Sequence, residues 1–210
     1  DRDVVADRRA YAARVLRRAP AVPPGTVQYS NAGYVVAGAM LEATTGDSWE
    51  RLIAAEVFAP LGIVGAGFGA PGTADATDQP LGHRAGWTGL RPVAPGPRAD
   101  NIPALGPAGT IHLTLEDMGR WMRAHLARDP AFLSPEGWAR LHAPAAADGH
   151  APGWLVEPDG RLWHNGSNTM WYAEATLWPD AGRALFLVVN QGDLARLPPL
   201  FRDVAALAFD

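Results

Sequence analysis

The sequence predicts an α+β domain in which helices come first and an antiparallel meander sheet follows. Apolar residues recur at helical spacing in several segments before residue 150. From Gly153 onward the pattern changes to that of strands joined by short turns, and a final amphipathic segment is available to cover the sheet. This order of elements favours α+β, with the helices laid on one face of the sheet.

The composition is typical of a single folded domain. The chain has 210 residues, of which 48% are hydrophobic and 19% charged, so a packed core is expected. The 23 glycines and 19 prolines have no fixed period, which indicates many ordered loops. A formal net charge of -4 argues against a nucleic-acid partner. The chain has neither cysteine nor lysine, which excludes disulfides, thiol chemistry and any mechanism that needs a lysine amine from this chain.

The two longest uncharged runs, 19–41 and 57–74, are interrupted by prolines. We therefore expect no transmembrane segment. No signal-peptide pattern opens the chain, which does not begin with methionine, so we interpret it as a piece of a longer product. Within it we expect one domain over 1–210, with helices and loops in 1–150 and the sheet plus a C-terminal helix in 151–210.

Three helices are predicted in the first 57 residues. The first spans about 4–18, and its arginines are interpreted as a solvated face. The second spans about 32–44 and ends at Gly46, the residue best able to adopt a left-handed terminal conformation. Asp47 and Glu50 form a variant of the capping box that opens the third helix. The arginines of the first helix are Arg8, Arg9, Arg14, Arg17 and Arg18.

The stretch 59–109 has little periodicity and holds much of the glycine and proline, so we expect ordered loops there. Thr114 and Asp117 open a further helix, which runs to about Ala127. Ser134 opens a short helix that has proline at its first position, where the missing amide donor costs nothing.

Four strands and a last helix are predicted after residue 150. Turns of the hairpin type at 158–160 and 179–182 join the first and the last pair of strands. The helix follows Pro199 and presents apolar side chains to the sheet. The predicted strands are 153–157, 161–165, 172–178 and 183–190. The apolar side chains of the helix are Phe201, Val204, Ala205, Leu207 and Ala208.

The segment Tyr29-Ser30-Asn31 is the first candidate for chemistry, because it lies between a proline-rich turn and an apolar helix. The positive end of the helix dipole favours the phenolate of Tyr29, which lets the hydroxyl act as a base nearer neutral pH. The amide of Asn31 can orient a substrate carbonyl or a neighbouring side chain. The alternative, which these residues alone favour, is that Asn31 caps the helix and Tyr29 packs.

The second candidate is the segment 164–168, with the sequence His-Asn-Gly-Ser-Asn, at the end of a predicted strand. Gly166 lets a ligand approach the strand backbone, and the N–H of Ser167 can donate to a developing oxyanion. His164 can present a polar or cationic group to an anionic substrate feature. The alternative is a β-bulge before a wide loop. Trp171 either walls a cleft or packs across strands.

Five motifs occur in order along nearly the whole chain. They are Pro23-Pro24-Gly25-Thr26-x-x-Tyr29-Ser30-Asn31, Gly33-Tyr34-x-x-x-Gly38, Phe58-Ala59-Pro60-Leu61-Gly62, Gly106-Pro107-Ala108-Gly109-Thr110, and His164-Asn165-Gly166-Ser167 ahead of a hairpin that ends in Val188-Val189-Asn190. This set resembles the serine β-lactamase-like hydrolases, nearest the class C, esterase, D-aminopeptidase and penicillin-binding-protein-like branch. The resemblance implies a β-lactamase/transpeptidase-like fold, incomplete without an upstream segment.

The resemblance also implies a mechanism, in which the serine of a Ser-x-x-Lys motif is acylated by an ester, amide or lactam and the acyl-enzyme is then hydrolysed. By the same resemblance Tyr29 transfers protons and Asn31 positions the substrate. His164 stands where many members carry lysine, and the N–H of Ser167 forms half of the oxyanion hole. The residues expected to bind substrate beside them are Asn165, Gly166, Asn168 and Trp171.

The chain departs from this family in one respect, since it contains no Ser-x-x-Lys. The nearest imitation begins at Ser48 and has Arg51 in the lysine position, but arginine cannot give up its proton near neutral pH. We interpret Ser48 as a residue that opens a helix. Because the family carries its motif upstream of the tyrosine, we expect this chain to be the C-terminal portion of such a hydrolase, with the missing N-terminal segment of the same product as its partner.

Two functions remain open at this point. The first is part of a serine hydrolase that acts on a small ester, amide, peptide or lactam substrate, and the second is a catalytically inactive module that binds ligands or peptidoglycan. The histidine spacing disfavours a metal hydrolase, and we expect neither a metal nor an organic cofactor. The resemblance favours a periplasmic or secreted location and leaves a cytoplasmic one open. Without the upstream segment we expect a marginally stable or self-associating chain.

Overall fold

The computed structural model describes residues 3–73, 75–76, 78–145 and 148–209. These residues form two compact units: unit 1 lies within 1–71 and 96–117, and unit 2 lies within 72–95 and 118–210. Among the described residues, no helix is both long and apolar enough to cross a membrane. The expected α+β class is confirmed, and the division at residue 150 stays a prediction.

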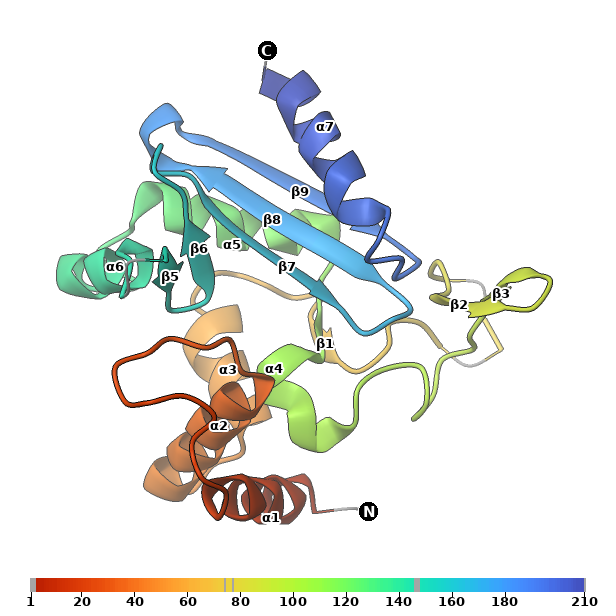
Figure 1. Cartoon of the computed structure of the whole chain (residues 1–210), viewed down its shortest axis with the longest axis horizontal. Helices are drawn as coiled ribbons and strands as arrows, with labels where there is room; N and C mark the ends of the chain where they lie inside the picture. The colour runs from red at the N-terminus through yellow and green to blue at the C-terminus, as the bar shows by residue number, and fades with distance from the viewer. Residues whose placement is uncertain (1–2, 74, 77, 146–147, 210) are drawn as a thin grey trace. The chain divides into compact units, whose positions relative to one another are not determined.

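Unit 1 is built around three helices that follow one another along the chain (Figure 1). They are α1 (Val4–Leu16), α2 (Asn31–Thr45) and α3 (Trp49–Ile53), the last of which continues as a π-helical turn, η1 (Ala54–Phe58). The predicted stop at Gly46 is confirmed, because this residue ends α2 with φ at 80°. Glycine adopts this left-handed conformation without the steric cost that a side chain would add.

Two predictions for these helices are wrong. Ser48, not Asp47, caps α3, since its Oγ accepts a hydrogen bond from the backbone N–H of Arg51 at 3.3 Å. Arg8 does not belong to a solvated face, because its side chain is fully buried and pairs with Glu42 of α2 and Glu50 of α3. The helical pattern of α1 therefore did not indicate that one of its arginines is buried, because the partners of that arginine lie on two other helices.

The remainder of unit 1 consists of short elements. These are β1 (Gly67–Phe68), η2 (Pro103–Leu105), α4 (Gly106–Gly109) and β4 (Ile111–His112), which pairs antiparallel with β1. The predicted helix start at Thr114 is confirmed, because its Oγ1 accepts from the N–H of Asp117 at 3.1 Å. The helix that begins there, α5 (Leu115–Ala127), passes from unit 1 into unit 2.

Unit 2 contains a five-stranded antiparallel meander whose order in space follows the order in sequence, as predicted (Figure 1). Its strands are β5 (His150–Ala151), β6 (Trp154–Val156), β7 (Leu162–Ser167), β8 (Tyr172–Trp178) and β9 (Arg183–Val189), with the short turn η3 (Pro179–Ala181) between the last two. The short strand β5 was not predicted.

Helices cover both faces of this sheet, so the prediction of helices on one face is wrong. Met122 of α5 packs with Ala175 and Leu177 on one face of β8. The other face carries Tyr172, which packs on Phe201 of α7 (Leu197–Phe209). Successive side chains of a strand point to opposite faces, and β8 has buried residues on both. A strand that is apolar on both faces requires a cover on each.

The last helix differs from its prediction at its start and in the exposure of one side chain. It begins at Leu197, so Pro198 and Pro199 lie in its first turn, where missing amide donors cost little. Leu207 was expected to cover the sheet, but its side chain is 80% exposed. The predicted contact of Ala208 concerns a side chain outside the described set. Phe201 is buried, as predicted.

Two further elements complete unit 2. The predicted short helix is confirmed as α6 (Pro135–His142), which Ser134 caps through a bond from the N–H of Gly137 at 3.1 Å. A separate hairpin of β2 (His83–Gly86) and β3 (Gly89–Pro92) was not predicted. All of β3 is exposed, so it lacks the alternation that marks a half-buried strand.

Candidate functional site

Tyr29 and Asn31 lie together at the start of α2 in unit 1. The Tyr29 hydroxyl donates a hydrogen bond to Oδ1 of Asn31 at 3.1 Å, and the tyrosine side chain is 56% exposed. A turn precedes them, in which the N–H of Thr26 donates to the carbonyl of Pro23 at 3.1 Å and Gly25 takes a positive φ of 85°. This turn delivers Tyr29 to the helix start with its phenol accessible to a ligand.

The cap of α2 is Ser30, whose Oγ accepts from the N–H of Gly33 at 3.1 Å. The alternative in which Asn31 caps the helix and Tyr29 packs is therefore wrong. Because Ser30 performs the capping, the amide of Asn31 is left to bind the Tyr29 hydroxyl. The N-terminus of α2 lies beside this pair.

His164 lies on β7 of unit 2, paired with Ala175 of β8. It shares the α5 face of the sheet with Leu162 and Gly166, since these residues alternate along the strand. The imidazole remains exposed, and loss of hydration to the surrounding protein lowers its pKa below the ordinary value of histidine. This shift favours the neutral imidazole over the positively charged one.

Gly166 and Ser167 end β7 in regular register, opposite Ala173 and Tyr172. Apart from its two chain neighbours, no described residue has a heavy atom within 4 Å of the position that a Cβ of Gly166 would take, so the strand is open to a ligand there. The Ser167 hydroxyl is already bound, because it donates to the carbonyl of Trp171 at 2.6 Å and accepts from the N–H of Thr169 at 3.0 Å. The alternative of a β-bulge at this strand end is not what the structure shows.

Asn165 and Asn168 make structural contacts in the same region. Oδ1 of Asn168 accepts from the N–H groups of Met170 and Trp171 at 3.0 and 2.9 Å, which builds the turn between β7 and β8. The amide of Asn165 donates to the Tyr172 hydroxyl at 3.0 Å. Asn165 thus points to the α7 face of the sheet, opposite to His164.

Sequence reasoning missed the segment that supports this turn. Trp171 packs against Gly82, where an added Cβ would lie 2.4 Å from its Nε1. Next to it, Nδ1 of His83 bonds the carbonyl of Asn190 at 3.0 Å, and the Asn190 amide donates to the carbonyl of Leu81 at 3.0 Å. Asn190 had been noted only as the end of a motif, and no local pattern links it to residues more than a hundred positions away.

A buried polar group on β8 was also missed. The Tyr172 hydroxyl donates to Oε2 of Glu174 at 2.8 Å, behind the strand that carries His164. Burial and the Glu174 carboxylate raise the pKa of Tyr172 to about 12. The phenol is therefore neutral and holds Asn165 and Glu174 in place. Period-2 patterning indicates which face such residues occupy but not which partners they find.

The predicted site residues thus form two groups, one at the start of α2 in unit 1 and one around the end of β7 in unit 2. Within the described ranges, no group of three or more His, Cys, Asp or Glu side chains is placed to hold a metal ion.

Three comparisons bear on the family of this chain. The family model described as Beta-lactamase matches residues 2–208. Penicillin-binding protein 4 of Amycolatopsis lactamdurans is 29% identical over 196 residues, which cover 81% of this chain and 49% of that protein. Unguisins hydrolase ungD' of Aspergillus campestris (strain IBT 28561) is 26% identical over 196 residues, which cover 86% of this chain and 35% of that protein.

Among solved structures, a penicillin-binding protein from Bacillus halodurans superposes with a TM-score of 0.77 at 21% identity, over 95% of this chain and 62% of that one. At this identity the likeness establishes the fold alone. The chain spans about half or less of the length of the curated relatives it matches.

Proposed function

The chain belongs to the beta-lactamase family of serine hydrolases, and on this premise we propose that it is the C-terminal part of an enzyme that forms an acyl-enzyme on an ester, amide or lactam. The observation that carries the proposal is the Tyr29–Asn31 hydrogen bond at the start of α2. A phenol beside a helix N-terminus, held by an amide and exposed to ligands, suits proton transfer.

The nucleophile comes from a segment outside these 210 residues, which contain no Ser-x-x-Lys. In this proposal Tyr29 acts as the phenolate. The hydroxyl oxygen of the nucleophile forms a bond to the substrate carbonyl carbon while its proton passes to the oxygen of Tyr29. The bond to the leaving group then breaks, and the departing nitrogen or oxygen takes that proton. Water completes the cycle by the same proton transfers and releases the acid product.

The residues of β7 have complementary roles in this proposal. The N–H of Ser167 donates to the carbonyl oxygen as negative charge develops on it. Gly166 leaves the strand backbone open, and His164 donates from a neutral imidazole to a polar group of the substrate. Asn31 positions the substrate amide, and Trp171 forms an apolar wall. The names of the two relatives, a penicillin-binding protein and an unguisins hydrolase, support hydrolysis and, for the first, a lactam ligand.

The test is active-site labelling with a fluorescent fluorophosphonate and a fluorescent penicillin. The probes are applied to the 210-residue chain and to the product extended upstream, and the labelled peptide is identified by mass spectrometry. We expect labelling of the extended product alone, on a serine outside the present sequence. Labelling of Ser30, Ser48, Ser134 or Ser167 would show that the nucleophile has been placed wrongly.

The absence of lysine also favours a second candidate function, a catalytically inactive module that binds peptides or peptidoglycan fragments. The two functions differ in what the upstream sequence contains and in turnover. An extended product that lacks Ser-x-x-Lys, reacts with neither probe and still binds peptidoglycan fragments would establish the second candidate and exclude the first.

A further inference from the structure

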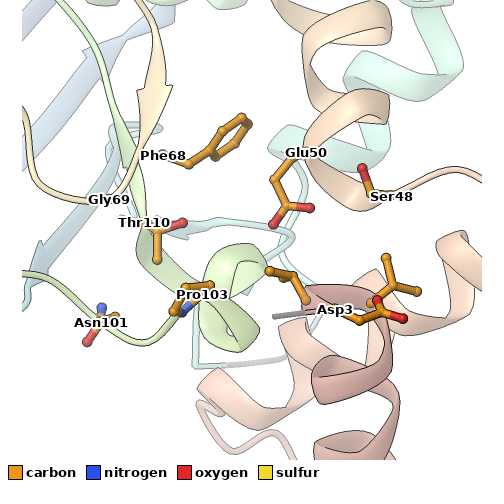
Figure 2. Close-up of a pocket in the computed structure, with 10 residues that line it drawn as sticks. Asp3, Ser48, Glu50, Phe68, Gly69, Asn101, Pro103 and Thr110 are labelled. Atoms are coloured by element: carbon orange, nitrogen blue, oxygen red, sulfur yellow. The ribbon is translucent and has the colours of Figure 1, made fainter. Parts of the chain in front are cut away.

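Unit 1 contains a cavity of about 490 Å³ that none of the predicted site residues lines (Figure 2). Its walls come from the start of α1, the start of α3, the end of β1 and the segment from Asn101 to Thr110. This volume is within the range of sites that hold a small organic molecule. Because Tyr29 and Asn31 lie outside it, the cavity has no part in the proposed hydrolysis.

The polar groups of the cavity are dominated by acceptors. Figure 2 shows the carboxylate of Glu50 and the hydroxyl of Thr110 turned toward one another. The carboxylate of Asp3 belongs to the same lining. Thr110 is only 4% exposed, and it lines the cavity. A hydroxyl that lines a cavity can form a hydrogen bond with a ligand there.

The cation that pairs with Glu50 is shared with a second carboxylate. The side chain of Arg8 is fully buried, and its guanidinium pairs with Glu42 as well as with Glu50. It also donates to the backbone carbonyls of Pro103 and Ala104, at 3.2 and 3.3 Å. One positive charge is therefore shared between two carboxylates, and Asp3 adds a third. The surroundings of the cavity carry a net negative charge.

The start of α1 also faces the cavity, and free helix amides there would attract an anion. Asp3 already caps this helix start, because its Oδ1 accepts a hydrogen bond from the N–H of Ala6 at 3.1 Å. A second anion would meet the carboxylates of Asp3 and Glu50 at close range. The charge balance consequently disfavours an anionic ligand.

The rest of the lining is apolar. The apolar lining residues are Val4 and Val5 of α1, Phe68 and Pro103. Phe68 is held by Trp49 and Phe58, at ring-centroid distances of 5.5 and 6.1 Å. A rigid apolar wall opposite a carboxylate and a hydroxyl suits a ligand with an apolar body and one cationic end.

We propose that this cavity binds a small organic ammonium ion with a compact apolar or aromatic body. The ammonium group donates to the carboxylate of Glu50 and to the oxygen of Thr110, and the carboxylate of Asp3 adds electrostatic attraction. The body of the ligand packs between the valines of α1 and Phe68. This site is independent of the proposed hydrolase function, since it shares no residue with it.

The test titrates the product extended upstream with benzylammonium chloride and follows backbone amide signals by heteronuclear NMR. For so small a ligand we expect a dissociation constant on the order of 1 mM. The shifted signals are expected at the start of α1, around Ser48 to Glu50, and at Phe68 and Thr110. Benzyl alcohol and benzoate, which have the same ring, are expected to bind more weakly.

Two variants remove one polar partner each, Thr110→Val and Asp3→Asn. Each is expected to raise the dissociation constant about fivefold, the effect of losing one modest polar interaction. Asparagine keeps the helix cap, so Asp3→Asn preserves the fold even if Thr110→Val does not. The matched control is Asp47→Asn, which removes the same charge from unit 1 outside the cavity and is expected to change nothing.

Three results would overturn the proposal. They are the absence of saturable shifts at the cavity, equal or tighter binding of benzyl alcohol or benzoate, and an equal loss of affinity in Asp3→Asn and Asp47→Asn. The last would indicate a general effect of net charge.

Discussion

Tyr29 is the residue on which the proposed chemistry depends most directly. Its hydroxyl is exposed, is bonded to Asn31 and lies at the positive end of a helix of 15 residues. Phenylalanine would keep the ring and remove the oxygen that carries the proton. No other change to the helix start is required, because Ser30 performs the capping.

We therefore expect Tyr29→Phe, made in the product extended upstream, to lower kcat/KM for an ester such as p-nitrophenyl acetate by about 10² to 10⁴-fold. The matched control is Tyr34→Phe, which removes a hydroxyl from an exposed tyrosine one turn further along α2 and is expected to leave the rate unchanged. An equal rate in wild type and Tyr29→Phe would remove Tyr29 from the mechanism.

At the scale of single residues, the sequence predicted where the candidate site residues lie better than it predicted what their side chains do. Tyr29 and Asn31 are close in sequence and in structure, so a local motif sufficed to pair them. Asn168 was expected to bind substrate, and the structure shows its side chain building a turn. Whether it also contacts a substrate stays a prediction. A turn-forming asparagine and a ligand-binding one look the same in a sequence, because the distinction depends on which N–H groups the fold presents.

At the scale of elements, one buried arginine connects the parts of unit 1. The guanidinium of Arg8 on α1 reaches Glu42 on α2, Glu50 on α3 and the carbonyl of Pro103 in η2. Glu42 in turn accepts from the N–H of Trp49 at 3.0 Å. Removing Arg8 would leave a buried carboxylate without its counter-charge, which is far more costly than losing a surface ion pair.

We expect Arg8→Ala to lower the free energy of unfolding by about 3–5 kcal/mol, or to prevent folding of so small a unit. Arg9→Ala, on the exposed side of the same helix, is expected to change it by no more than about 0.5 kcal/mol. Urea denaturation followed by tryptophan fluorescence measures both. Equal effects of the two substitutions would show that the buried pairing contributes nothing beyond helix formation.

The contact between α5 and α6 depends on two neutral histidines. Nδ1 of His125 lies 2.9 Å from Nε2 of His142, among the rings of Trp121, Trp138 and Trp154. Burial, and secondarily the neighbouring His142, lowers the pKa of His125 to about 3. Burial, and secondarily Arg128, lowers that of His142 to about 4. The folded chain therefore resists protonation that the unfolded chain accepts near pH 6.5.

The contribution of this histidine pair to the free energy of unfolding is fully present above pH 6.5. It is lost as the pH falls from there toward 4 and below, because the unfolded state then binds more protons than the folded state does. We expect the melting temperature to fall by roughly 5 °C between pH 7 and pH 5. Calorimetry of His125→Phe should show a smaller dependence on pH, whereas the control His150→Gln should retain it. If the melting temperature of His125→Phe depended on pH as that of the wild type does, the pH dependence would not come from this histidine pair.

Helices and strands were predicted well where the apolar residues have a clear helical or strand period. They were predicted poorly where contacts between residues distant in sequence determine which side chains are buried. Strand-forming residues fill the segment before the turn at 179–182, and β8 was predicted with its exact bounds. The burial of Arg8 and the cover of both sheet faces could not be predicted, because each depends on partners distant in sequence. The hairpin of β2 and β3 lacks a buried face, and hence any periodic signal.

At the scale of the whole molecule, the described surface carries more exposed apolar side chains than a monomer needs. On α2, Tyr34, Met40 and Leu41 are 42, 65 and 50% exposed, and Tyr34 and Leu41 lie two turns apart on one side of the helix. In unit 2, Val188 of β9 is 41% exposed, and β9 ends the described sheet without a strand beyond it. Exposed apolar side chains and a strand edge without a partner among the described strands both favour association.

We therefore expect the isolated chain to self-associate, and light scattering coupled to size-exclusion chromatography should give a mass that rises with protein concentration. The double variant Met40→Gln/Leu41→Gln makes one of these surfaces polar without touching the core, so it should shift the chain toward the monomer. Val64→Gln is the matched control, because Val64 is 87% exposed but lies outside α2. If association depended on total surface hydrophobicity alone, this control would reduce it as well. A monomeric wild-type chain with a sharp cooperative melt would show that these surfaces need no cover.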